Sequence, residues 1–193
     1  PMQTEWILWR RLDTPGHDAC RLVQRRSGWR LEGSAVFQHA TGAPACLAYR
    51  IDCDTAWRTH SAAVRGWVGA RRLDLRISRT AEDRWLLGGE AVADWRGCAC
   101  LDLGFTPATN LAQLRRAALQ VGEAVDVPVA WLDVPDGTAE VLAQRYERRG
   151  IRQYWYEAPR FDYAALLEVS PAGFVTSYPG LWEAETATTM QRG

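Results

Sequence analysis

Hydrophobic and polar side chains alternate with a period of two along several stretches of the chain. In RLDLRIS, for example, Leu73, Leu75 and Ile77 alternate with charged or polar residues. A period of two places alternate side chains on opposite faces of an extended strand, so it predicts β-structure. The alternating stretches span residues 72–78, 101–105, 125–131 and 161–169.

Turn-forming sequences separate these runs at short intervals. They are RSG (26–28), TGAP (41–44), TAED (80–83), LGG (87–89), VPDG (134–137) and SPAG (170–173). Many short strands between close turns are typical of an antiparallel sandwich, barrel or roll. Pro128 lacks a backbone N–H, so we expect its strand to lie at a sheet edge or to bend there.

Two stretches have the local features of helices. Residues 110–121 follow a Thr/Asn cap and precede Gly122, and residues 138–149 follow Asp136 or Thr138 as possible caps and precede Gly150. Both also contain residues that alternate, such as Leu142, Gln144 and Tyr146 in the second. Periodicity alone therefore leaves helix and strand open for both stretches.

Length and composition indicate one soluble β domain. With 193 residues, 47% of them hydrophobic and 24% charged, the chain can form one real core and is short for two. No stretch approaches the roughly 18 apolar residues of a membrane-spanning helix. We expect a single domain over residues 1–182 and a disordered tail over residues 183–193.

Charge and motifs exclude several classes of function. The 23 basic residues balance 23 acidic ones, so the broad basic face that nucleic-acid binding requires is missing. The three histidines and five cysteines lack metal-ligand spacing, and no nucleotide-binding or nucleophile motif occurs. We therefore expect no cofactor, no metal and no nucleic acid. The N-terminal sequence lacks the pattern of an export signal, which favours the cytoplasm.

Several blocks together resemble the bacterial putative glycolipid-binding protein family. They are AYRIDCDTAWRT (48–59), DRWLLGG (83–89), GCACLDLGFTPATNLAQLRR (97–116), VAWLDVP (129–135), QRY (144–146), YWYEAPRFDYAALLEV (154–169) and GFVTSYPGLW (173–182). The resemblance covers nearly the whole chain.

This resemblance implies a mainly β, single-domain antiparallel spiral β-roll, similar to an open, lipid-carrier-like barrel. It favours strands for residues 110–121 and 138–149, and we adopt that expectation against their local helical features. One departure is that the family pattern has a proline just before the paired arginines, where this chain has Ala112 and Gln113.

The segment around Asp102 is the leading candidate for a polar ligand site. Asp102 lies between Leu101 and Leu103, so in a strand it projects to the opposite face, toward solvent or a cavity. A carboxylate accepts hydrogen bonds from sugar hydroxyls, and nearby polar side chains could add donors and acceptors. These neighbours are Thr106, Thr109, Asn110, Arg115 and Arg116, of which at most one arginine shares the site if the segment is extended. An Asp–Arg pair with an Asn turn cap explains the same residues equally well.

Aromatic residues form the second group of candidates. The ten tryptophans could stack on a sugar ring or line an acyl chain, but most would more simply fill a β core. Trp57 has polar neighbours that include Arg58, and we group these two with Tyr146, Tyr154 and Tyr156 as candidate ligand contacts.

Asp52 and Asp54 lie on one side of a predicted strand and raise the possibility of glycosidase chemistry. Two carboxylates on one side of a strand have no way of flanking a scissile bond from opposite faces. Asp54 with Arg58 is more simply a turn with a salt bridge.

The leading hypothesis is non-catalytic binding of an amphipathic small molecule, a glycolipid or another lipid, in a β-roll cavity. Burial of the apolar tail would supply most of the affinity. One alternative is an enzyme that acts on a sugar or lipid conjugate with Asp102 or Asp54 as general base. The other is a structural protein whose core is filled by its own side chains.

Overall fold

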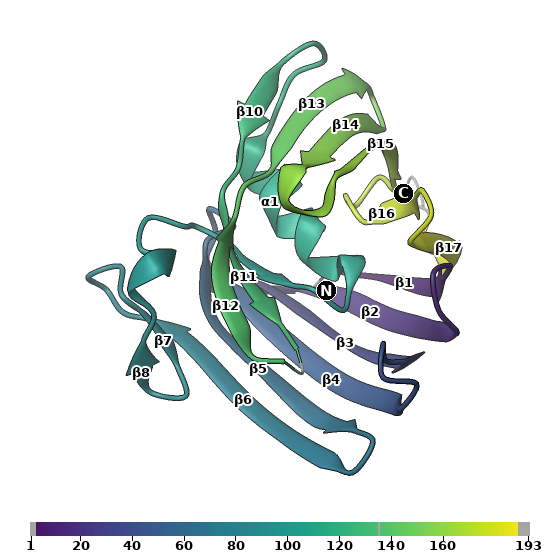
Figure 1. Ribbon diagram of the computed structural model, residues 1–193. Helices are drawn as coiled ribbons and strands as arrows, with labels where there is room; N and C mark the ends of the chain where they lie inside the picture. Colours follow the sequence, from purple (N-terminus) through teal and green to yellow (C-terminus); the bar gives the residue numbers. More distant parts are fainter. Residues whose placement is uncertain (1–2, 135, 189–193) are drawn as a thin grey trace.

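The computed structural model describes residues 3–134 and 136–188, which build a 14-stranded antiparallel sheet that curls without closing (Figure 1). The strand order is β10-β13-β14-β15-β16-β17-β1-β2-β3-β4-β5-β6-β7-β8. Two meanders, one from each half of the chain, make up this sheet. They meet where β17 pairs with β1.

The first meander runs in chain order, each strand beside the next. Its strands are β1 (Thr4–Arg11), β2 (Gly16–Arg25), β3 (Gly28–Gln38), β4 (Pro44–Cys53), β5 (Thr59–Val68), β6 (Arg71–Arg79), β7 (Trp85–Leu87) and β8 (Glu90–Ala91). The second meander contains β10 (Ala124–Asp126), β13 (Arg145–Gly150), β14 (Gln153–Ala158), β15 (Tyr163–Val169), β16 (Val175–Tyr178) and β17 (Trp182–Ala187).

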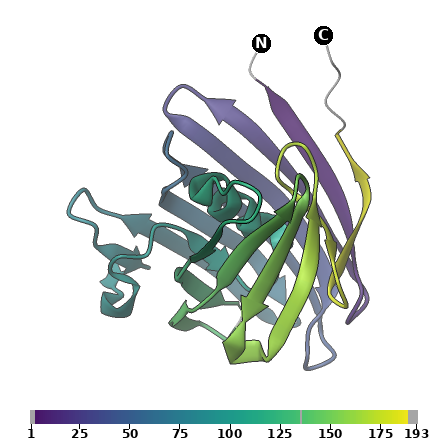
Figure 2. The ribbon, with the colours of Figure 1, turned by 90° about the horizontal axis from the view of Figure 1, so that it is seen from above.

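A small second sheet and one helix lie inside the curl (Figures 1 and 2). The second sheet has the order β12-β11-β9, with β9 (Leu101–Leu103) parallel to β11 (Val129–Asp133) and β12 (Thr138–Leu142) antiparallel to it. Helix α1 (Asn110–Ala117) follows β9. The described residues also contain three short 3-10 helices: η1 (Ala93–Trp95), η2 (Pro107–Thr109) and η3 (Pro159–Phe161).

Alternation along the strands sends one set of side chains to the interior. In β4 every second residue from Ala45 to Cys53 is buried, and Leu73 and Ile77 are buried in β6 while Asp74 and Arg76 are exposed. The main core joins the first meander to the inner sheet, and a smaller core lies between α1 and the second meander. This is the open, single-domain β-roll that the sequence predicts.

The predicted strands and turns are largely confirmed. Residues 72–78 lie in β6, and residues 163–169 of the fourth stretch form β15. The stretch 125–131 divides into β10, at the edge of the large sheet, and β11 in the inner sheet, and Pro128 lies in the break between them. A proline there costs no ladder hydrogen bond, which explains its position.

The expectation of a strand over residues 110–121 is wrong, because residues 110–117 form helix α1. The Thr106 hydroxyl accepts a hydrogen bond from the Ala108 N–H at 3.1 Å and caps η2, which leads into α1. Ala118 adopts a left-handed conformation and ends the helix four residues before Gly122. The local helical features of this segment were therefore the correct indication.

The expectation of strands over residues 138–149 is confirmed by β12 and β13. Leu142, Gln144 and Tyr146 are all buried, as their alternation indicates. Helix-forming residues such as Glu140 lie here in strands because β12 pairs with β11, and β13 pairs with β10 and β14.

The expected disordered tail is wrong for Glu183–Ala187, which belong to β17 and pair with β1. Their short, weakly apolar pattern gave no strand signal, and pairing with both β16 and β1 supplies the order. Residues 189–193 of the predicted tail lie outside the described residues.

Candidate functional site

A cavity of about 430 Å³ lies between the inner sheet and strands β14 to β17, and we call it the inner cavity. Its lining combines carboxylates with aromatic rings. The carboxylates are Asp13, Asp102 and Asp133, and the rings are Trp131, Tyr156, Phe161, Tyr163, Tyr178 and Trp182. Leu103, Gly104, Thr106, Asn110 and Arg11 also line it.

Asp102 is the buried carboxylate of the inner cavity. It lies in β9, where its Oδ1 accepts hydrogen bonds from the Thr109 hydroxyl and, at 3.4 Å, from the Gln113 amide. Its Oδ2 has no hydrogen-bond partner among the described residues and is not enclosed, so it is open to the cavity. Burial raises the pKa of Asp102 to about 6, against the opposing effect of these two hydrogen bonds.

A network of hydrogen bonds behind Asp102 connects α1 to the second meander. The Tyr146 hydroxyl donates to Gln113 Oε1 at 2.6 Å and accepts from Asn110 Nδ2 at 2.7 Å. Gln144 donates to the same Gln113 oxygen at 2.9 Å and accepts from the Tyr156 hydroxyl at 2.6 Å. Burial raises the pKa of both tyrosines, so they remain protonated donors.

A second buried carboxylate, Asp18, is linked through Tyr49 to Thr106, which lines the inner cavity. The Tyr49 hydroxyl donates to Asp18 at 2.9 Å and accepts from the Thr106 hydroxyl at 3.3 Å. Burial raises the pKa of Asp18 to about 6. The segment from Thr106 to Thr109 is thus held between two aspartates with raised pKa values.

Gly104 leaves space beside a donor and an acceptor. A Cβ at this position would lie 3.1 Å from Trp131 Nε1 and 3.7 Å from Asp133 Oδ1. Trp131 Nε1 has no hydrogen-bond partner among the residues that the structure describes, and burial raises the pKa of Asp133. Both groups are available to a polar ligand.

The rim of the inner cavity carries one bidentate ion pair. Arg11 donates to both oxygens of Asp13, at 2.7 and 3.2 Å, and its guanidinium lies 5.4 Å from the Trp182 ring. Phe161 is half exposed at the rim and contacts Trp131 edge to face. The site therefore offers a polar interior with an aromatic entrance.

Three tyrosine rings form one wall. The ring centroids of Tyr156, Tyr163 and Tyr178 lie 5.5 to 6.1 Å from one another, in tilted or edge-to-face pairs. We call these residues the tyrosine wall.

The structure brings six of the eleven sequence-predicted site residues together. Asp102, Thr106, Asn110 and Tyr156 line the inner cavity, while Thr109 and Tyr146 hold the lining residues from behind. The other five lie elsewhere: Trp57, Arg58, Arg115, Arg116 and Tyr154.

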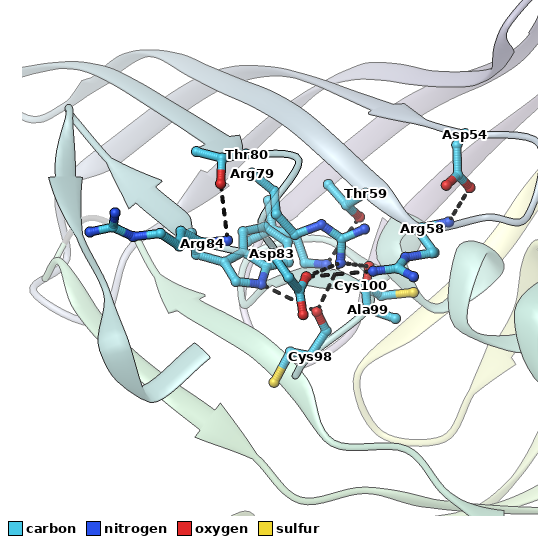
Figure 3. A network of polar contacts seen from close by, with 12 residues as sticks. Asp54, Arg58, Thr59, Arg79, Thr80, Asp83, Arg84, Cys98, Ala99 and Cys100 are labelled. Atoms are coloured by element: carbon cyan, nitrogen blue, oxygen red, sulfur yellow. Dashed lines mark hydrogen bonds and ion pairs between the residues drawn. The ribbon is translucent and has the colours of Figure 1, made fainter. Parts of the chain in front are cut away.

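Trp57 and Arg58 lie in the loop between β4 and β5. Trp57 has a φ of 63° and stacks on Trp29 at 4.7 Å. The Asp54 Oδ1 accepts from the backbone N–H of Arg58 at 2.8 Å, which confirms the predicted turn (Figure 3).

The predicted Asp54–Arg58 salt bridge is wrong, because the Arg58 guanidinium pairs with Asp83 at 3.5 Å. Asp83 also pairs with Arg79 at 3.4 Å, and Arg79 donates to the Cys98 carbonyl at 3.0 Å (Figure 3). This network fastens the β6–β7 turn to residues 98–100. Asp52 pairs instead with Arg30 at 2.6 Å.

Arg115 and Arg116 lie in the last turn of α1, where cations interact favourably with the helix dipole. Arg115 donates to the Ala172 carbonyl and Arg116 to the Ala56 carbonyl. Neither lines the inner cavity, so the structure places neither arginine beside Asp102. Tyr154 and Arg115 line a separate hollow of about 400 Å³ beside the end of α1.

Several residues of the site were not predicted from the sequence. Gln113 and Gln144 join the network, and Arg11, Trp131, Asp133, Tyr163 and Tyr178 line the cavity. Asp133 comes at the end of an alternating apolar run, and Asp102 lies within another. That similarity could have indicated Asp133 as a site residue. The others come from segments far apart in the sequence and carry no local motif.

Fold and site together define an open antiparallel β-roll with a small, polar and aromatic cavity. The family model described as Putative glycolipid-binding matches residues 6–184, and the chain belongs to this family. A crystal structure of a DUF1089 family protein from Pseudomonas aeruginosa is similar to 84% of this chain, with 25% sequence identity and a TM-score of 0.75. The match covers 89% of that protein, and no curated protein matches the chain.

Among the described residues, no helix has the length and apolar character needed to cross a membrane.

Proposed function

We propose that this protein binds an amphipathic ligand, a glycolipid or another lipid, with the polar head group in the inner cavity and without any chemistry on it. The observation that carries the proposal is the Asp102 Oδ2 atom, which is open to a cavity lined by aromatic rings. A carboxylate oxygen accepts from sugar hydroxyls, and aromatic faces pack on the C–H faces of a sugar ring. The family description supports the same class of ligand.

The size of the inner cavity favours the head group over the tail. A water molecule occupies about 30 Å³ of liquid, and a carbon or oxygen of a ligand with its hydrogens needs a similar volume. A cavity of about 430 Å³ therefore holds on the order of fourteen such atoms, roughly one sugar ring and the first carbons of a chain. The rest of the tail would extend past the half-exposed Phe161 at the rim.

Native mass spectrometry of the protein from its own host, with lipid extraction of the same sample, tests the proposal. We expect a bound mass that extracts as an amphiphile. Asp102→Asn preserves the shape of the side chain and should reduce the bound fraction, whereas Asp74→Asn on the exposed side of β6 should not. If the wild type and Asp74→Asn both show the mass of the polypeptide alone, that result would contradict the proposal.

An enzyme is the second candidate, because a buried carboxylate with a pKa near 6 inside a cavity is a common general base. Asp102 is the candidate base, since Asp54 does not line the cavity and accepts backbone hydrogen bonds in its turn. A screen against glycosides and esters tests this candidate. Turnover that disappears in Asp102→Ala would favour the enzyme over the binding protein.

A further inference from the structure

The inner cavity carries an excess of negative charge. Its lining contains three carboxylates, Asp13, Asp102 and Asp133, and one guanidinium, that of Arg11. Arg11 and Asp13 form a bidentate pair and neutralise each other. Asp102 and Asp133 have no ion-pair partner within 4.0 Å among the described residues, so two carboxylates face the cavity without a cation.

Nearby cations outside the lining are engaged by other groups. The Arg160 guanidinium pairs with Glu140 at 2.9 Å, lies 5.1 Å from the Trp131 ring and also has an electrostatic effect on Asp133. His39 has some electrostatic effect on Asp133, but its ring hydrogen-bonds Thr41. Asp136 adds a further negative charge near Asp133.

Among the described residues, no cationic side chain forms an ion pair with the Asp102 carboxylate. Its Oδ1 is occupied by an alcohol and an amide, and its Oδ2 is open to the cavity. Removing a carboxylate from water is costly unless a cation or several donors compensate. A ligand cation at Oδ2 would compensate this cost more fully than a hydroxyl.

The tyrosine wall also favours a cation. Tyr156 and Tyr178 lie close enough to Asp102 to interact electrostatically with its carboxylate. Aromatic faces attract cations within about 6 Å of the ring centroid. A carboxylate beside several tyrosine rings is a suitable environment for an ammonium group.

We propose that the head group bound in the inner cavity carries a basic amino group, as in an amino sugar or a long-chain amine, and that its ammonium contacts Asp102 and the tyrosine wall. Anionic head groups such as phosphates are rejected by the two unpaired carboxylates. This inference rests on the proposed function and narrows its ligand class.

Three octyl glycosides that share one alkyl chain test the inference: the glucosaminide, the glucoside and a phosphorylated glucoside. Calorimetric titration of the full chain near neutral pH and at low salt should rank them in that order. We expect the glucosaminide to bind at least about tenfold more tightly than the glucoside, and the phosphorylated ligand more weakly than either. Equal affinities, or tighter binding of the phosphate, would overturn the inference.

Two variants connect the ranking to the cavity. Asp102→Asn removes the charge and should reduce the preference for the amine to about twofold or less. Asp74→Asn removes an exposed carboxylate that pairs with Arg65 and should leave all three affinities unchanged. An amine preference that persists in Asp102→Asn would show that the ammonium lies elsewhere and overturn the inference.

Gly104→Val distinguishes failure of this inference from failure of the proposed function. Gly104 has no left-handed φ, so valine adds volume beside Trp131 Nε1 without imposing a forbidden backbone conformation. It should abolish binding of every ligand. If no octyl glycoside binds the wild type, or Gly104→Val binds as the wild type does, the proposed function fails and the inference fails with it.

Discussion

Two buried aspartates hold the short segment that forms the inner side of the cavity. The Tyr49 hydroxyl donates a hydrogen bond to Asp18 and accepts one from Thr106, and the Thr109 hydroxyl donates directly to Asp102. Burial raises the pKa of each carboxyl group from 3.8 to about 6. Between pH 3.8 and about 6 the folded state binds more protons than the unfolded chain, so the free energy of unfolding decreases as the pH rises. Above about pH 6 both carboxyl groups are ionised in the folded and the unfolded state, so their destabilising contribution remains constant.

Asp102→Asn should therefore stabilise the protein at high pH. The amide keeps an acceptor for Thr109 but carries no charge that burial would penalise. We expect a gain of roughly 1 to 3 kcal/mol in the free energy of unfolding near pH 8 and little change near pH 4. Urea denaturation at both pH values measures the difference.

The exposed Asp74 provides the control for this measurement. Its ion pair with Arg65 is solvated, so Asp74→Asn should change stability by less than about 1 kcal/mol at either pH. If Asp102→Asn instead lowers stability equally at both pH values, the carboxylate is a net stabilising group and the account of its raised pKa is wrong.

Individual site residues could be predicted from sequence where the local pattern constrained them. Asp102 interrupts an alternating apolar run, so its side chain had to project away from the neighbouring leucines, and the structure directs it into the cavity. Trp57 and Arg58 lie outside the inner cavity, and their polar neighbour Asp54 accepts backbone hydrogen bonds in a turn. Gln113 had no signal, since its partners Tyr146 in β13 and Gln144 just before β13 lie about thirty residues further along the chain.

Among the elements, α1 is joined to β13 through the hydrogen bond between Gln113 and Tyr146. Both residues are fully buried, so loss of one partner leaves the other without compensation by water. Gln113→Ala and Tyr146→Phe should each cost about 1 to 3 kcal/mol, and the double variant should cost less than their sum.

A double-mutant cycle by chemical denaturation measures this coupling, which we expect to be at least about 0.5 kcal/mol. Tyr163→Phe is a suitable comparison, because its hydroxyl donates to the exposed Pro179 carbonyl and makes no contact with Gln113. Additive costs for Gln113 and Tyr146 would mean that the network does not connect α1 to the sheet energetically.

Strand β17 joins the two meanders, because it pairs with β16 on one side and with β1 on the other. Ala184→Pro removes a backbone donor and imposes a restricted φ within an inner strand, and should cost about 2 kcal/mol or more. Glu185→Ala, one residue away, loses only exposed ion pairs with Arg10 and His17 and should cost less than about 1 kcal/mol. Thermal unfolding compares the two variants, and similar small effects would support a disordered tail instead.

Element types could be predicted where pairing and local preference agree, as in β6 and β15. Residues 110–117 and 138–149 have similar helical preference, yet only the first segment is a helix. The difference is tertiary: β12 and β13 lie beside partner strands, whereas α1 lies inside the curl and satisfies its backbone internally. Local sequence does not indicate which strands that are far apart in the chain will be adjacent.

For the molecule as a whole, the inside of the curled sheet is largely occupied by its own chain. The inner sheet and α1 pack against the concave face, and the main core runs across both (Figure 2). The sequence resemblance predicted the open roll, but it did not predict how little interior space remains. The inner cavity is a space that remains beside the inner sheet for a head group.

Because of this filled interior, we expect affinity to depend on the head group more than on tail length. A methylene that becomes fully buried contributes about 0.8 kcal/mol, or nearly fourfold in affinity. In a series of hexyl, octyl and decyl glycosides that share one head group, the first carbons fill the cavity beside Trp131 and Phe161, and the later ones remain in solvent at the rim. Affinity measured by calorimetry, below the concentration at which each ligand forms micelles, should therefore increase less than about twofold per added carbon beyond hexyl. A sustained increase of nearly fourfold per carbon up to decyl would mean that α1 or the inner sheet moves aside to admit the tail, as a carrier that encloses its lipid requires.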